Sequence, residues 1–337
     1  MRQVWIPRFG APTVFEVREA ADPQPGPGEV RVKVEAAGVN FADVQARTGL
    51  YPDAPPLPFV VGYEVAGVID AVGEGVDAAR IGQAVMAMTR FGGYSSMIVV
   101  PDLQAIPRPP GLDAVHGAAI PVVYATAWMM LEEMGRIRAG DRVLVHSAGG
   151  GVGLAALDLI KWRGAYAIGT ASPGKHAFLK ERGFDQVVDY KQDLEQSLKD
   201  QPGLDLILDP IGGDSWTQGL RLLRPGGRLI CFGFSSNSTG ETRNVLAVMR
   251  NLASVPWLKM NPISLMNENK GVMGVNMGHM WHEGPRIVGW LREILALWSE
   301  GKVRPMVHAE VPFSKAGDAH RILQERKNVG KVILIPD

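Results

Sequence analysis

The chain has 337 residues, 46% of them hydrophobic and 21% charged, which is the composition of an ordinary globular protein. Its 35 basic residues balance 35 acidic ones, so no net field favours nucleic acid or an anionic membrane surface. We therefore expect a neutral or small partner, and no nucleic acid. The length exceeds what one hydrophobic core usually supports, so two domains are expected.

A single cysteine, Cys231, excludes an intrachain disulfide and any multi-cysteine zinc site. This usage is typical of a reducing compartment, so we expect a cytoplasmic protein. The start, MRQVWIPRFGAPTVFEV, lacks the apolar stretch of a signal peptide. The longest apolar run, residues 117–131, is too short to span a bilayer and contains Pro121, so it predicts a buried helix and no integral membrane segment.

The first part of the chain has the pattern of short strands. Residues 29–35, EVRVKVE, alternate valine with charged side chains, which predicts a half-buried strand. Glycine-punctuated strand patterns follow at residues 63–76, 83–88 and 94–101. We expect the first 115 or so residues to be all-β.

After residues 106–111, IPRPPG, apolar strand-like runs alternate with helical segments. The runs are RVLVH, YAIGT, QVVDY, LDLILD, RLICFG and GVMGVNM. Strands that are apolar at every position suit a parallel, doubly wound sheet covered by helices on both faces, so the fold class is α/β. From about residue 285 one amphipathic helix precedes β-like segments, which we expect to rejoin the first domain. The link at residues 235–271, rich in Met, Leu and Trp, is long enough to suggest a function or a helix of its own.

Residues 147–160, SAGGGVGLAALDLI, follow a predicted strand and begin a predicted helix. Ala148, Gly150 and Gly153 occupy the positions of the G-x-G-x-x-G fingerprint, in which backbone N–H groups and a helix start meet a pyrophosphate. We expect Ala148, Gly150, Gly151, Val152 and Gly153 to bind a dinucleotide. The alternative is a purely structural glycine-rich turn.

An NAD site has an acidic residue about twenty positions further on, which bonds the ribose 2′-OH, and that acid is missing here. Thr170, Ser172 and Lys175 stand there instead. Hydroxyl and ammonium groups suit a 2′-phosphate, so we predict NADPH as the cofactor. The alternative for Lys175 is a solvated lysine at a helix start.

Several motifs resemble those of the medium-chain dehydrogenase/reductase superfamily over the whole chain. They are AGVNFADVQARTGLYP, VVGYEVAGVI, AGGGVG, DPIGGDSW and LRPGGRLICFG. The chain resembles the zinc-free quinone oxidoreductase branch, and residues 259–279 are similar to its VAT-1-like members. The resemblance implies a GroES-like β-rich catalytic domain at residues 1–120 and 285–337 and a Rossmann NADPH-binding domain at residues 121–284. It also implies a homodimer.

Zinc-dependent relatives hold the metal with a Cys and a His where this chain has Asn40 and Tyr63. Without a Lewis acid, oxidation of an alcohol is disfavoured, and an acceptor that needs less activation is implied. His279 and His282, in HMWH, have no apparent third ligand, so we predict no metal site.

We predict that the Asn40 amide and the Tyr51 hydroxyl stabilise charge on a conjugated carbonyl oxygen after hydride transfer. Tyr51 also stands where similar enoyl reductases place a proposed proton donor. Asp43, the third predicted catalytic residue, matches an N-x-x-D pattern and is expected to brace the loop and the cofactor. The alternatives are a packing role for Tyr51 and a left-handed turn at Asn40.

The resemblance implies further cofactor contacts. They are Thr126, Tyr190, Gly233, Phe234 and Asn328, the last in a C-terminal turn with Gly330 and Lys331. For Thr126 the alternative is a helix hydroxyl bonded to its own backbone.

The sequence therefore predicts a zinc-independent, NADPH-dependent reductase of a quinone, an enone or an enoyl thioester such as enoyl-CoA. A CoA tail would favour basic residues, for which Arg47, Arg90 and Arg250 are the candidates. The alternative is a low-turnover NADPH-binding, VAT-1-like protein that acts through partners or a membrane surface, supported by the apolar link.

Overall fold

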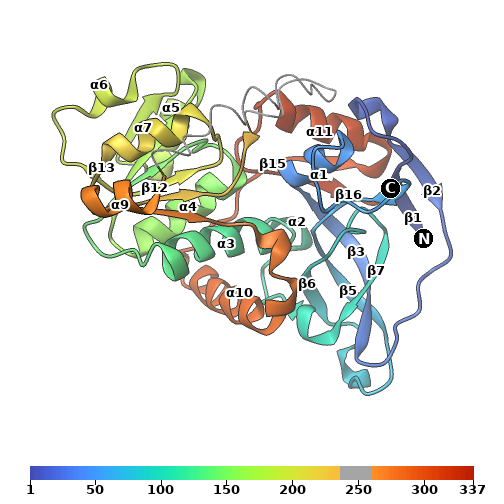
Figure 1. Cartoon of the computed structure of the whole chain (residues 1–337). Coiled ribbons are helices and arrows are strands. Elements are labelled where there is room, and N and C mark those ends of the chain that lie inside the picture. Colours follow the sequence, from blue (N-terminus) through green and yellow to red (C-terminus); the bar gives the residue numbers. More distant parts are fainter. Residues whose placement is uncertain (236–259) are drawn as a thin grey trace. The chain divides into compact units, whose positions relative to one another are not determined.

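The computed structural model describes residues 1–235 and 260–337, which divide into two compact units. The first unit contains residues 1–125 and 277–337, and the second contains residues 126–235 and 260–276. These units meet in the sequence near residues 125 and 277, whereas the expected boundaries are at residues 120 and 285. Both chain termini belong to the first unit (Figure 1).

Two sheets form most of the first unit (Figure 1). The seven-stranded sheet contains β3 (Glu29–Val39), β5 (Glu64–Val72), β6 (Ala84–Met88), β7 (Met97–Pro101), β8 (Ile106–Pro107), β15 (Val307–Pro312) and β16 (Lys331–Ile335). The three-stranded sheet contains β1 (Arg2–Ile6), β2 (Glu16–Glu19) and β4 (Phe59–Val60). β16 pairs antiparallel with β3, so the C-terminal strand rejoins the N-terminal part as predicted.

The alternating pattern of β3 determines which of its faces is buried. Val30 and Val32 are fully buried in the core of the first unit, whereas Lys33 and Glu35 are exposed. Because burial of one valine side chain stabilises a fold by roughly 1.5–3 kcal/mol, a register slip of one residue would be costly. The strand end that carries Asn40 is therefore fixed relative to the sheet.

The helices of the first unit differ in part from the prediction. They are α1 (Phe41–Arg47), α2 (Ala114–Gly117), α10 (Gly284–Ser299) and α11 (Ala316–Gln324), while α3 (Pro121–Trp128) begins in this unit and ends in the second. The expectation that the first 115 residues are all-β is wrong at α1, and α11 was not predicted. α1 has only seven residues, too few for a clear apolar period, whereas α11 buries Ala316, Ala319 and His320 at helical spacing and was overlooked because these side chains are small or polar.

The helical run Ala114–Met134 consists of α2, α3 and the π-helical turn η4 (Met129–Met134). It is long and apolar enough to be a candidate membrane span, with a mean hydropathy of 1.4. However, 78% of its most apolar window is buried inside the protein, as in the core helix of a soluble fold. Among the described residues, no other helix is long and apolar enough to cross a membrane.

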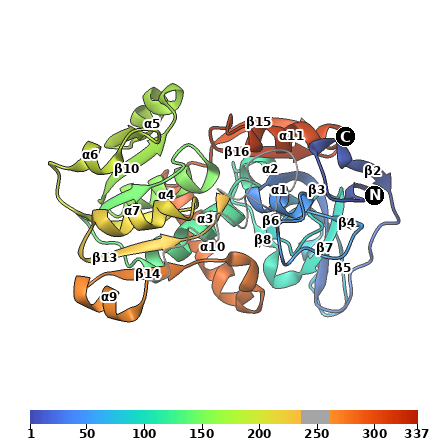
Figure 2. The same ribbon diagram turned by 45° about the horizontal axis from the view of Figure 1, so that its top comes forward.

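The second unit contains a six-stranded parallel sheet, as predicted. Its order is β11-β10-β9-β12-β13-β14. The strands are β9 (Arg142–Val145), β10 (Tyr166–Ala171), β11 (Gln186–Asp189), β12 (Leu204–Asp209), β13 (Leu223–Cys231) and β14 (Gly271–Gly274). The helices are α4 (Gly151–Trp162), α5 (His176–Arg182), α6 (Leu194–Leu198), α7 (Asp214–Leu222) and α9 (Pro262–Glu268), which Figure 2 shows around the sheet.

Part of the long link predicted at residues 235–271, residues 236–259, lies outside the described residues. Its described end contains α9, which exposes Ile263 and Met266. Short 3₁₀ turns complete the described chain: η1 (Pro12–Val14), η2 (Ala78–Arg80), η3 (Asp102–Gln104), η5 (Pro173–Lys175), η7 (Met277–His279), η8 (Trp281–Glu283) and η9 (Phe313–Lys315).

Candidate active site

Asn40 follows β3 directly and is the N-cap residue of α1. Its backbone is extended, with φ −122° and ψ 158°, so the alternative of a left-handed turn residue is wrong. Its backbone N–H donates to Asp43 Oδ2 at 2.7 Å, which closes the first turn of the helix. The stretch that reads as a loop in the sequence is therefore a helix start.

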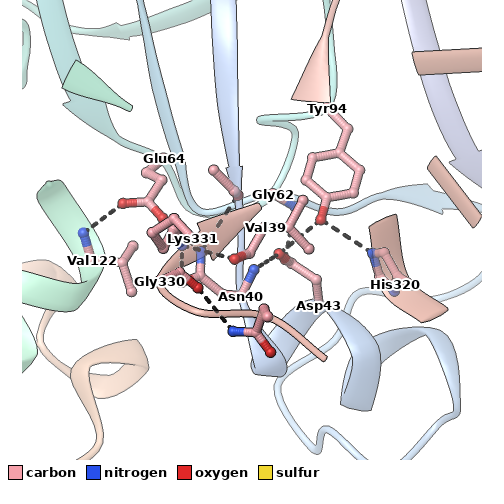
Figure 3. Close-up of polar contacts among 12 residues, drawn as sticks. Val39, Asn40, Asp43, Gly62, Glu64, Tyr94, Val122, His320, Gly330 and Lys331 are labelled. Carbon is pink, nitrogen blue, oxygen red and sulfur yellow. Dashed lines mark hydrogen bonds and ion pairs between the residues drawn. The ribbon is translucent and has the colours of Figure 1, made fainter. Parts of the chain in front are cut away.

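The Asn40 side chain belongs to a buried network with Lys331 and Glu64 (Figure 3). Lys331 Nζ lies 2.6 Å from Glu64 Oε1 and 2.8 Å from both Asn40 Oδ1 and the Val39 carbonyl. The lysine thereby uses all three of its donors. Its ammonium group points into the first unit, although the resemblance placed Lys331 in a turn on the cofactor side.

The same network orients the Asn40 amide. Asn40 Nδ2 donates to Glu64 Oε1 at 2.9 Å and makes only a long contact, 3.5 Å, with the Gly38 carbonyl. The second Glu64 oxygen accepts the backbone N–H of Val122 at 2.7 Å. Asn40 therefore has one weakly engaged N–H with which it can meet a ligand.

Asp43 is fully buried and accepts three hydrogen bonds (Figure 3). The donors are the backbone N–H groups of Asn40, at 2.7 Å, and Gly62, at 3.2 Å, and the Tyr94 hydroxyl, at 2.9 Å. Burial raises the pKa of Asp43 to about 7, against the opposing effect of the bonds from Asn40 and Tyr94. The side chain thus ties α1 to the segment before β5, which is a bracing position.

Behind Asp43, the Tyr94 hydroxyl also lies 3.1 Å from His320 Nε2. Burial lowers the pKa of His320 well below its usual value, helped by Arg47, so the imidazole is neutral. Because Tyr94 gives its hydrogen to Asp43, the His320 Nε2–H donates to the Tyr94 oxygen. Sequence reasoning missed Glu64, Tyr94 and His320, since they come together only in the fold.

Arg47 is also fully buried, and its Nη2 donates to Gln324 at 2.6 Å. Its suggested role in binding a CoA tail is therefore wrong, because its guanidinium does not reach the surface. Arg90 is exposed, and Arg250 lies outside the described residues.

Tyr51 and Tyr63 belong to an aromatic cluster with Phe91 and Phe59. The Tyr51 and Tyr63 rings meet edge to face, with centroids 6.1 Å apart, and Phe91 lies 5.0 Å from Tyr63 and 6.4 Å from Tyr51. Tyr51 is partly buried, and burial raises its pKa, so the phenol is a neutral donor at pH 7. Tyr63 is 6% exposed, and its hydroxyl has no hydrogen-bond partner among the described residues.

His279 and His282 are engaged separately. His279 Nε2 lies 2.7 Å from Asp53 Oδ2, and His282 Nε2 lies 3.7 Å from Glu283 Oε1. In the part of the chain that the structure describes, no three His, Cys, Asp or Glu side chains are grouped so that they could hold a metal ion.

In the second unit the glycine-rich loop joins β9 to α4. Gly150 precedes the helix with extended backbone, and Gly151 and Val152 form its partly buried first turn. A Cβ at Gly153 would lie 2.6 Å from the carbonyl oxygen of Ala148, so only glycine lets the helix pack this closely. The helix start and the close packing fit the pyrophosphate of a dinucleotide.

Lys175 lies beside this loop. A Cβ at Gly149 would meet Lys175 Cδ at 3.0 Å, so the lysine stem runs along the glycines. Ser172, partly buried, stands just before η5. The position of Thr170 does not agree with its predicted role in binding the cofactor. The residue is 3% exposed, and its hydroxyl lies 3.0 Å from His146 Nδ1. Its hydroxyl therefore supports the sheet and is not turned to a ligand.

The remaining predicted cofactor residues lie in different settings. Thr126 is buried, Tyr190 is 48% exposed at the end of β11, and Gly233 packs against Pro210. Phe234 stacks on Trp216 with ring centroids 5.4 Å apart. Asn328, in the first unit, donates to the Gly330 carbonyl at 2.8 Å.

Two family models match the chain. The model of the alcohol dehydrogenase GroES-like domain matches residues 26–110, and that of the zinc-binding dehydrogenases matches residues 182–334. Together they cover parts of both units.

Curated relatives match almost the whole chain. The human synaptic vesicle membrane protein VAT-1 homolog is 38% identical over 96% of this chain and 82% of its own length. Rat quinone oxidoreductase is 31% identical over 99% of this chain and 98% of its own.

Solved structures agree with this fold. The quinone oxidoreductase of Thermus thermophilus, also solved in complex with NADPH, has a TM-score of 0.82 at 30% identity, covering 99% of this chain and all of that one. The CurK enoyl reductase has a TM-score of 0.84 at 26% identity, covering 100% and 99%.

Proposed function

The chain belongs to the medium-chain dehydrogenase/reductase superfamily as a VAT-1-like oxidoreductase, and from this premise we propose that it is an NADPH-dependent reductase of a quinone or a conjugated C=C bond. Quinone oxidoreductases and an enoyl reductase are among the proteins that it resembles. A quinone or an enone is the leading acceptor, and an enoyl thioester such as enoyl-CoA is the second.

One observation carries the proposal: Asn40 and Tyr63, which stand where the resemblance places the zinc ligands of zinc-dependent relatives, make other contacts. Asn40 is bound on both ends of its amide by Lys331 and Glu64, and Tyr63 lies in an aromatic cluster. An acceptor that is already electron-poor needs only hydrogen-bond donors for its developing oxyanion. The partly buried Tyr51 hydroxyl and the second N–H of Asn40 supply them.

The glycine-rich loop before α4 in the second unit favours NADPH as the cofactor. When bound, this cofactor supplies hydride from C4 of its nicotinamide. The loop with Ala148, Gly150 and Gly153 would hold the pyrophosphate, and Lys175, whose stem lies beside Gly149, would bind the 2′-phosphate. Residues 170–175, TASPGK, offer no carboxylate to repel it.

After hydride attack on an enone, a proton must reach the α-carbon, and a quinone must gain one on oxygen. Tyr51 is the group proposed to give it. Asp43 braces the Asn40 end of α1. Its carboxyl is fully buried and accepts hydrogen bonds from the protein, so it does not contact the substrate.

Oxidation of NADPH with matched panels of quinones, enones and enoyl-CoA esters tests the proposal. Turnover should occur with at least one panel and should survive treatment with a chelator. Tyr51→Phe should lower kcat about tenfold or more and leave the Kd for NADPH unchanged. An unaltered rate would remove Tyr51 from the mechanism, and activity that zinc alone restores would overturn the metal-free chemistry.

We also propose that the protein is a cytoplasmic homodimer. Residues 228–233 lie mostly in β13, which pairs with β12 and β14, whereas β14 is the edge strand of this sheet among the described residues. A second copy can extend the sheet at β14. Light scattering should give twice the chain mass, and Val272→Pro should reduce it.

A second candidate is favoured by α9. Ile263 and Met266 are 71% and 74% exposed on one short helix, and exposed apolar side chains of this kind mark interaction sites. A low-turnover, NADPH-binding protein that acts through partners or a membrane surface would use them. Binding of NADPH without turnover on any acceptor, together with vesicle binding that Ile263→Ser abolishes, would favour this candidate.

A further inference from the structure

Two unfavourable features occur together in the aromatic cluster around Tyr51. The Tyr63 hydroxyl is buried without a hydrogen-bond partner among the described residues, which destabilises the folded state. Phe91, against which the Tyr63 ring packs, has a φ of +67°, a left-handed conformation that a bulky side chain rarely adopts. Such features persist when the surrounding structure enforces them, and they gather at functional sites.

Phe91 accounts for the placement of both tyrosines. Its ring centroid is 5.0 Å from that of Tyr63 and 6.4 Å from that of Tyr51, and Phe59 supports it from 6.1 Å. The two tyrosine rings stand edge to face, at 68°. The strained backbone thus holds the pair of phenols side by side in the first unit.

Burial and the Asp43 and Asp53 carboxylates raise the pKa of both hydroxyls, which differ in the effect that each phenol has on the other. Burial raises the pKa of Tyr51, whereas the neighbouring Tyr63 hydroxyl lowers it. For Tyr63, burial raises the pKa, and so do the Asp43 carboxylate and Tyr51. Tyr63 is therefore the phenol that keeps its proton, and Tyr51 is the one that can release it.

A packing role alone does not explain Tyr63. A phenylalanine would fill the same space and make the same ring contacts, without a buried polar atom. The hydroxyl therefore needs a function, and in the proposed reaction charge develops on the oxygen of Tyr51, whose ring meets the Tyr63 ring edge to face.

We infer that Tyr63 is a positioning residue whose hydroxyl donates a hydrogen bond to Tyr51 as Tyr51 gives its proton to the reduced acceptor. The inference rests on the proposed function. In that step the Tyr51 O–H bond breaks, its proton bonds to the acceptor that has received hydride, and the electron pair stays on the Tyr51 oxygen. No bond of Tyr63 breaks, and water later restores the Tyr51 proton.

The direct test places 3-fluorotyrosine at position 51 and follows its ionisation by fluorine NMR. In the Tyr63→Phe background the pKa at position 51 should rise, because the donor that stabilises its anion is gone. Tyr166→Phe, which removes a partly buried phenol of the second unit, is the matched control and should leave that pKa where it was. An unchanged pKa in Tyr63→Phe overturns the inference, and this readout needs neither turnover nor NADPH.

Kinetics supply the second test. Tyr63→Phe should lower kcat about tenfold, enlarge the solvent deuterium isotope effect and shift the basic limb of the pH profile upward, with KM little changed. Its resistance to urea should be equal to or greater than that of the wild type. Slower turnover that comes only with lost stability would contradict the inference. If Tyr51→Phe itself has no effect on rate, Tyr51 is not the proton donor, and if no acceptor is reduced at all, the proposed function fails. In both cases the NMR result still decides the coupling of the two phenols.

Discussion

Lys331 Nζ lies 2.6 Å from Glu64 Oε1, and both side chains are almost completely buried. The two residues are far apart in the sequence and meet because β3, which Asn40 follows, pairs with β16 on one side and with β5, which begins at Glu64, on the other. The ion pair thus joins the last strand of the chain to the candidate active site. Removal of one partner leaves the other as a buried, uncompensated charge.

Lys331→Met should therefore lower the free energy of unfolding by about 3–5 kcal/mol in urea titrations. The double variant Lys331→Met with Glu64→Gln should recover part of this loss, because no charge stays buried. Lys327, which pairs with Glu325 at the surface, is the control, and Lys327→Met should cost less than about 1 kcal/mol. Equal losses in the two lysine variants would show that the buried pair is not important for stability.

The raised pKa of Asp43 predicts an unusual pH dependence of the free energy of unfolding. Burial raises its pKa to about 7 in the folded protein, whereas an unfolded aspartate titrates near 3.9. Between about pH 4 and 7 the folded state holds the extra proton, so the contribution of Asp43 to stability falls as the pH rises. Asp43→Asn should flatten this slope relative to the wild type in urea titrations across that range. The same slope in both proteins would contradict the assignment.

The parallel sheet of the second unit and the β-rich first unit were predictable, because strands buried on both faces and half-buried strands leave different patterns. Residues 142–146 and 204–209 are apolar runs, and β9 and β12 lie there. α1 was missed, because its start depends on Asp43 and not on an apolar repeat.

Local motifs single out Gly153 and Tyr51 in the sequence, and their roles in the candidate site stay predictions. The partners of Asn40 and Thr170 could not be predicted from the sequence. Lys331 and Glu64 reach Asn40 only through strand pairing, and Thr170 is directed inward by His146, which its own neighbours in the sequence do not reveal.

A side chain at position 153 is expected to clash with the glycine-rich loop. Gly153→Ala would place a Cβ 2.6 Å from the carbonyl oxygen of Ala148, so α4 must move away from the loop. We expect a loss of roughly 1–3 kcal/mol in stability and weaker binding of NADPH in calorimetry. Gly289 in α10, where a Cβ meets nothing within 4 Å, is the control. Gly289→Ala should raise stability by up to about 1 kcal/mol, and similar effects of the two changes would argue against close packing at Gly153.

Lys175 predicts the choice between the two nicotinamide cofactors. Its stem lies along Gly149, and its ammonium group is the charge proposed to meet the 2′-phosphate. Lys175→Ala should weaken the binding of NADPH by about 1.5–3 kcal/mol, or roughly tenfold to a hundredfold in Kd, and should change the affinity for NADH little. Lys180, exposed on α5, is the control for a general loss of positive charge, and Lys180→Ala should leave both affinities unchanged. Calorimetric titration with each cofactor separates the cases, because equal losses for NADPH and NADH in Lys175→Ala would mean that Lys175 does not contact the 2′-phosphate.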